Sequence, residues 1–139
     1  PRPAKHRIVF DTPEAFSRRF ITNASLAANA GGPLAQAVGD YKEIEDARVE
    51  DGFAFKSFAA DRAGRKFGEY AGNGATAKKL QRKFDSGISE KDIMPATADL
   101  PAFMPAADFK RRYGDIDAPE YKKMMADIDR RIAALPLYR

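Results

Sequence analysis

The sequence predicts a mainly α-helical fold in which short helices are joined by extended connectors rich in proline and glycine. Apolar residues recur at helical spacing in several stretches, and typical helix-starting and helix-ending residues flank them. Nine prolines and ten glycines keep the helices short. The chain has no tryptophan and much alanine, which gains little free energy on burial. We therefore expect an open chain whose shape a partner stabilises.

Residues 1–139 are interpreted as a single unit. In chain order the segments are an extended arm (1–11), a helical segment (12–50), a basic aromatic segment (51–87), a proline-rich connector (88–116) and a C-terminal helix (117–136). The stretch RIVF in the arm could form one short strand.

The helical segment is predicted to hold two helices. Thr12 can cap the first, Pro13 suits its first turn, and Phe16 and Phe20 share a face four residues apart. The stretch NASLAANAGGP is interpreted as a weakly specified linker.

The second of these helices is expected from about Leu34 to Val49. Leu34, Val38 and Tyr41, with Ile44 or Glu45, fall near one stripe of such a helix.

Glycines and prolines organise the middle of the chain. Gly68, Gly72 and Gly74 are interpreted as turn residues with positive φ. The basic helix KKLQRKF should end at DSG, where Gly87 can take the left-handed cap. Ser89 can cap a single turn at SEKDIM, and the prolines that follow exclude a long helix.

The C-terminal helix is the most clearly specified element. Asp117 can cap it, Pro119 and Glu120 suit its first turn, and Pro136 ends it. Its apolar stripe consists of Tyr121, Met124, Met125, Ile128, Ile132 and Leu135.

The net charge of +4 is distributed in blocks of alternating sign. Residues 40–51 carry six acids against two bases, and residues 52–83 carry eight bases against two acids. Such blocks suit complementary pairing with neighbours better than a continuous nucleic-acid stripe, because phosphate repels the acidic blocks.

The sequence also bears on location. The absence of cysteine fits a reducing compartment, no apolar run is long enough to span a membrane, and no signal-peptide pattern occurs. A chain starting at Pro1 is what removal of an initiator methionine would leave. We expect the host cytoplasm or a virion or procapsid, with an organellar location as the alternative.

No catalytic or metal-binding pattern emerges. His6, the single histidine, lies in a terminal arm without an oriented carboxylate. Asp115, Asp117 and Glu120 lack the spacing of a calcium loop, and GNGATAKK lacks the order of a phosphate loop. We expect no enzymatic activity, no metal and no cofactor.

The basic aromatic segment leaves three interpretations open: partner interface, ordinary core and nucleic-acid groove. The candidate partner-binding residues, including those of the C-terminal helix, are Phe53, Phe55, Phe58, Phe67, Tyr70, Tyr121, Met124, Met125, Ile128 and Ile132. In the nucleic-acid alternative, aromatic side chains would stack on bases and phosphates would be contacted by Lys56, Arg62, Arg65, Lys66, Lys78, Lys79, Arg82 and Lys83. The partner interface is favoured, since acidic blocks flank the segment.

Residues 82–136 follow a known pattern: a basic segment closed by glycine, a helix start of the type Y-G-D…P-x-Y, and a helix end A-x-L-P. The matching residues are Arg82, Phe84, Gly87, Tyr113, Gly114, Asp115, Pro119, Tyr121, Ala133, Leu135 and Pro136. In these motifs the chain resembles the gokushovirus-like internal scaffolding proteins of microviruses, although its helix is a few residues shorter. The resemblance implies a helical, non-catalytic protein that holds capsid subunits through scattered aromatic and charged contacts.

The expected function is therefore that of a non-enzymatic structural protein, a scaffolding or minor component of a viral particle. Its partner would be a larger protein assembly, the capsid protein if the particle is viral, and it would act in many copies. A basic nucleic-acid-binding or genome-packaging protein and an accessory subunit of an organellar complex are the alternatives.

Overall fold

A computed structural model describes residues 14–49, 52–101 and 103–139, and this part of the chain is mainly helical, as predicted. The helices are α1 (Glu14–Ala30), α2 (Gly32–Val49), α3 (Phe55–Gly72), α4 (Gly74–Asp85), α5 (Glu90–Ile93), α6 (Ala106–Tyr113) and α7 (Pro119–Ala133), and a 3-10 turn, η1, covers Pro136–Tyr138. The arm with its RIVF stretch and His6, the cap Thr12 and Pro13 lie outside the described residues.

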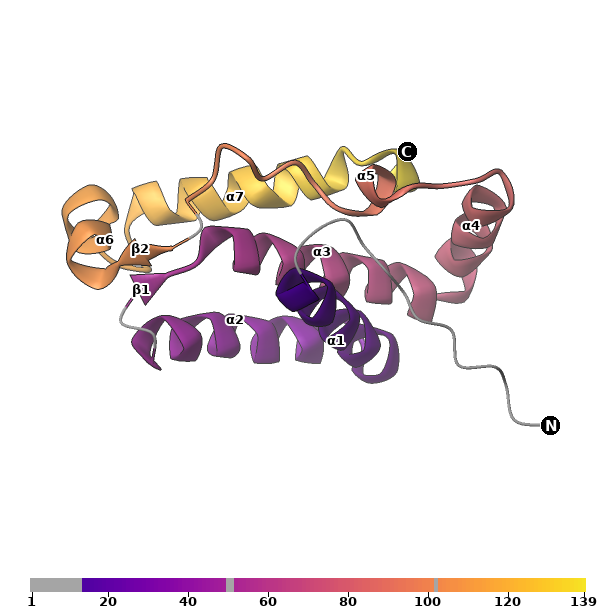
Figure 1. The fold of residues 1–139 in the computed structure, drawn as a ribbon. Coiled ribbons are helices and arrows are strands. Elements are labelled where there is room, and N and C mark those ends of the chain that lie inside the picture. Colours follow the sequence, from indigo (N-terminus) through magenta and orange to yellow (C-terminus); the bar gives the residue numbers. More distant parts are fainter. Residues whose placement is uncertain (1–13, 50–51, 102) are drawn as a thin grey trace.

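Helix α3 occupies the centre of the molecule (Figure 1). It lies between α2 and α7, and α1 crosses it. The two-residue strands β1 (Gly52–Phe53) and β2 (Met104–Pro105) pair antiparallel beside α6, near the start of α3, whereas α4 follows its end.

Small residues allow α1 and α3 to pack backbone against backbone. Gly64, Gly68 and Gly72 recur every fourth residue, on one face of α3. A methyl group at Gly64 would lie 2.1 Å from the carbonyl oxygen of Phe20, and one at Gly68 would lie 2.1 Å from that of Ala24. Glycine is needed there because any side chain would collide with the neighbouring backbone.

This packing overturns two predictions. Most of the stretch interpreted as a linker, Asn23 to Ala30, lies within α1, where Asn23, Ala24 and Ala27 are buried. Its end is a stop, as predicted: Gly31 has a positive φ and separates α1 from α2. Gly68 and Gly72 belong to α3 and Gly74 starts α4; none is a positive-φ turn residue. The positive-φ glycines of the described part include Gly87, as expected from its predicted cap.

The large apolar side chains gather in one core around the first half of α3. Phe55, Phe58 and Ile128 are almost completely buried, and the ring of Phe53 stacks on Phe109 with 3.7 Å between ring centroids. The core joins β1, α3, α6 and α7. The expectation of an open chain is therefore wrong for the described residues, because many of their large apolar side chains are buried against one another.

The last third of the chain follows the predicted order with two corrections. Helix α7 starts at Pro119 and precedes Pro136, as expected, but its cap position is Ala118. Asp117 does not cap; its backbone N–H donates a hydrogen bond to Asp115. Helix α6 was not predicted within the proline-rich connector, and it begins directly after Pro105.

Candidate interaction surfaces

The residues predicted to bind a partner form the chain's own core. Phe53, Phe55, Phe58, Tyr121, Met125, Ile128 and Ile132 are buried. Phe67, Tyr70 and Met124 are half-buried: the ring of Phe67 packs against Phe20 and Phe84, and that of Tyr70 against Tyr138. The structure corrects the prediction for the seven buried residues, since each would have to leave the core to reach a partner.

The eight cations proposed for nucleic acid do not share a surface role. Arg62 and Arg65 face carboxylates of α2, and the ammonium group of Lys66 lies over two tyrosine rings. Lys56 is half-buried in α3. The remaining four cations, Lys78, Lys79, Arg82 and Lys83, lie on α4.

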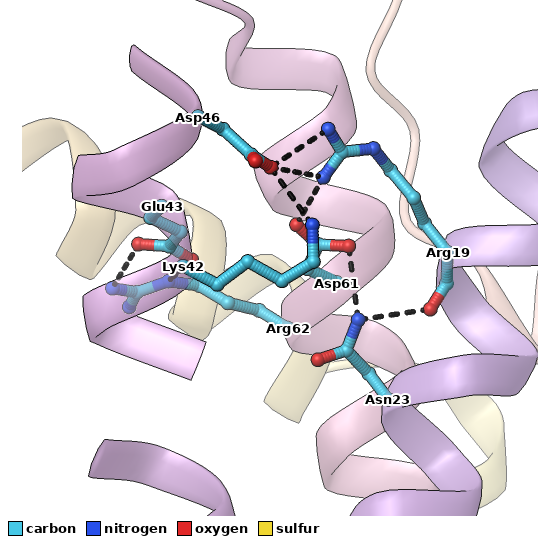
Figure 2. Close-up of polar contacts among 7 residues, drawn as sticks. All are labelled: Arg19, Asn23, Lys42, Glu43, Asp46, Asp61 and Arg62. Carbon is cyan, nitrogen blue, oxygen red and sulfur yellow. Dashed lines mark hydrogen bonds and ion pairs between the residues drawn. The ribbon is translucent and has the colours of Figure 1, made fainter. Parts of the chain in front are cut away.

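Two ionic clusters connect the helices in the interior (Figure 2). In the first, Arg19 of α1 donates to Asp61 of α3 at 2.8 Å and to Asp46 of α2 at 3.0 Å. Asn23 donates to the other oxygen of Asp61 at 3.0 Å, and Lys42 donates to Asp46 at 3.0 Å. Asp61 is only 4% exposed, and burial raises its pKa even though the charge of Arg19 acts in the opposite direction.

The second cluster is centred on Arg62 of α3. Its guanidinium group donates to both carboxylate oxygens of Glu43, at 3.0 and 3.3 Å, and to Asp129 of α7 at 2.7 Å. Burial raises the pKa of Glu43 to about 7, and the nearby charge of Arg62 only partly offsets this. Burial lowers the pKa of Arg62, but the carboxylates outweigh it and the net shift is upward.

Both clusters are suited to positioning helices. Each charged group in them faces a group of opposite charge, so each buried charge has a neutralising partner beside it. Sequence reasoning missed them because it assigned the acidic residues of α2 to pairing with neighbours and not to pairing within the chain. One available signal was Asp61, an acid embedded in the alanine- and glycine-rich stretch AADRAG.

The ionic clusters determine which way α2 faces. Its inner face carries small or ionic residues, namely Ala35, Gly39, Glu43 and Ala47, all of which are buried. Its outer face carries large apolar residues whose exposed fractions are 57% for Leu34, 39% for Val38, 68% for Tyr41 and 44% for Ile44. We call these four residues the outer stripe of α2.

One end of the outer stripe reaches a groove between α2 and α7. The groove has a volume of about 360 Å³, and Ile44, Tyr121 and Met125 contribute its apolar lining. Glu43 and Asp129 lie beside them, with Arg62 between the two carboxylates.

Two features are absent from the described residues. No helix there combines the length and apolar character that crossing a membrane requires. No group of three or more histidine, cysteine, aspartate or glutamate side chains is arranged to hold a metal ion in the same part of the chain.

Comparison of the chain with protein-family models, with curated proteins and with solved structures found no match in any of the three.

Proposed function

We propose that this chain is a non-enzymatic assembly protein that docks on a larger protein assembly through the outer stripe of α2. The observation that carries the proposal is the exposure of Leu34, Val38, Tyr41 and Ile44 along one face of a helix whose inner face is already packed. Solvent-facing helix surfaces are normally polar, and contiguous exposed apolar patches mark interaction sites.

Simple rotation of α2 could not bury the outer stripe within the chain. Turning the helix would expose Glu43 and Asp46 and would separate them from Arg62 and Arg19. A methyl group at Gly39 would lie 2.8 Å from the Arg65 guanidinium group, so the inner face has no room for a larger residue unless Arg65 moves. Covering the stripe therefore falls to another molecule.

The spacing of the stripe suits a groove on a partner. Its residues follow one another at intervals of four, three and three along α2, which is how a helix presents anchors to a groove. Each large apolar side chain removed from water contributes about 1.5–3 kcal/mol. Four such side chains give a contact strong enough to hold a subunit in an assembly after ordering costs are subtracted.

The resemblance of residues 82–136 to microvirus internal scaffolding proteins supplies the kind of assembly. In that setting the chain would be a multi-copy scaffolding or minor component of a procapsid in the host cytoplasm, and its partner would be the capsid protein. Because the described residues have a core of their own, the chain would dock on its partner as a preformed unit.

A photo-crosslinking amino acid at position 41, introduced in the host that expresses the gene, tests the docking proposal. We expect a discrete cross-linked product containing an assembly protein, and none from the same amino acid at position 18. Arg18 is a matched control because its side chain is 74% exposed on a different helix, α1.

A second pair of variants measures the contribution of the stripe. Leu34→Ser combined with Val38→Ser should reduce the cross-link at position 41 about tenfold or more, because two apolar contacts are lost. Ile21→Ser, at a 38% exposed residue of α1, should leave it unchanged. Equal cross-linking from positions 18 and 41, or a product containing only a second copy of this chain, would contradict the proposal.

A further inference from the structure

Helix α4 carries a cationic face that the docking proposal does not use. It consists of Lys78, Lys79, Arg82 and Lys83, which we call the α4 basic face. At 100° per residue these four positions fall within an arc of about 140° on the helix surface. Three of the four side chains are exposed and Lys83 is half-buried.

The α4 basic face differs from Arg19, Arg62 and Arg131 in lacking an acidic partner. Arg19 and Arg131 each contact two carboxylates, and Arg62 contacts three. Within the described residues, no ion pair involves the four cations of α4.

The arrangement of these cations has an energetic cost. Lys78 and Arg82, like Lys79 and Lys83, are like-charged neighbours four residues apart, which destabilises a helix by about 0.2–0.5 kcal/mol per pair. The negative end of the helix dipole offsets this for Arg82 and Lys83, which lie in the last turn. Lys78 and Lys79 lie before that turn and gain less from it, so an external anion would stabilise them most.

We propose that the α4 basic face binds the phosphate backbone of nucleic acid without reading its sequence. The contact is limited to phosphates, because the aromatic residues proposed for base stacking are already packed within the chain. Phe53, Phe55 and Phe58 are buried in the core, and Phe67 and Tyr70 pack against Phe84 and Tyr138. Clustered cations that neutralise phosphates release counterions, and this release drives sequence-independent binding.

The structure favours nucleic acid over the other polyanions. A membrane-binding helix inserts a continuous apolar face. Helix α4 offers only Phe84, which is 46% exposed and packs one side on Phe67, because Leu80 is 4% exposed. An acidic protein surface would add an apolar centre to its contact, and the α4 basic face offers none. A second copy of this chain is disfavoured because Glu43 and Asp46 are already paired internally.

Fluorescence anisotropy of the full chain with a labelled DNA duplex of about 25 base pairs tests the proposal across a salt series. With four phosphate contacts, the logarithm of the association constant should fall with the logarithm of salt concentration at a slope of about −3.6. Lys78→Gln combined with Lys79→Gln should bring this slope to about −1.8 and weaken binding about tenfold or more at low salt.

The matched control is Lys122→Gln combined with Lys123→Gln, which removes two adjacent exposed lysines from α7 and changes net charge equally. Its affinity and salt slope should stay close to those of the unaltered chain. Equal weakening by the two pairs would overturn the proposal, since only total charge would then matter. An affinity for the duplex that does not change with salt concentration would overturn it as well. So would an equal affinity for polyglutamate or for phosphatidylserine vesicles.

Discussion

The two halves of α3 are packed in opposite ways. The first half buries large rings: Phe55 and Phe58 meet side chains from β1, α6 and α7. The second half has glycine at the interface and lets α1 approach so closely that no side chain fits between the two backbones. A chain without tryptophan can thus form a close-packed interior in two ways: large side chains can fill the space between helices, or small residues can let the helix backbones approach. Both bring atoms into van der Waals contact.

The aromatic half should be the more sensitive to truncation of a side chain. Phe55 is fully buried and contacts four other aromatic rings, so Phe55→Ala should lower the free energy of unfolding by about 4 kcal/mol. Phe84→Ala is the control, because Phe84 is 46% exposed and should lose much less. Urea unfolding followed by circular dichroism measures both values, and similar losses would show that the ring cluster does not dominate stability.

The glycine half should be the more sensitive to enlargement. Gly68→Ala places a methyl group against the carbonyl oxygen of Ala24, so α1 must move away, at a cost of about 3 kcal/mol. Gly74→Ala is the matched control: it lies at the start of α4 in open space, and it should be neutral or slightly stabilising. If thermal melts show the same midpoint for both variants, the close approach of α1 and α3 does not contribute to stability.

The ionic cluster around Arg62 lies between the two halves and should make stability depend on pH. The pKa of Glu43 rises from an ordinary value of 4.5 to about 7, so the folded state holds this proton more tightly than the unfolded state. The stabilisation from Glu43 is therefore complete below about pH 4.5 and is lost as pH rises through 7. We expect the free energy of unfolding to fall by about 2 kcal/mol between about pH 5 and about pH 7.5.

Glu43→Gln should remove this slope, because glutamine does not titrate. Urea unfolding at several pH values compares the variant with the unaltered chain, and the difference isolates the contribution of Glu43 from that of other titrating groups. A slope that is the same in both proteins would place the titration elsewhere.

The sequence was informative where a local rule determines local structure. Helices α2, α4 and α7, the positive φ of Gly87 and the turn after Ser89 all follow from caps, stops and periodicity. It failed where structure depends on residues far apart in the chain. Gly64, Gly68 and Gly72 resemble breakers until α1 lies against them, and only the fold reveals that contact.

The residues of the candidate surface could be predicted from the sequence, but whether they face the core or the solvent could not. Leu34, Val38 and Tyr41, with Ile44 or Glu45, were predicted to lie near one stripe, and such a stripe usually faces the core. Here Arg19 and Arg62 bind acids on the opposite face of α2 and turn the stripe outward. The orientation depends on ion pairs that span 27 and 19 residues, which no short window of sequence displays.

The pairing of β1 with β2 has a consequence for synthesis on the ribosome. Phe53 lies opposite Met104, so the ladder and the helices after it complete a core whose first aromatic residues emerge much earlier. A nascent chain can assemble α1, α2 and α3 from consecutive segments, yet the rings of Phe55 and Phe58 stay uncovered until α7 has left the exit tunnel. Translation that stalls before that point would leave a fragment with exposed aromatic side chains. Chaperones bind exposed apolar surface of this kind.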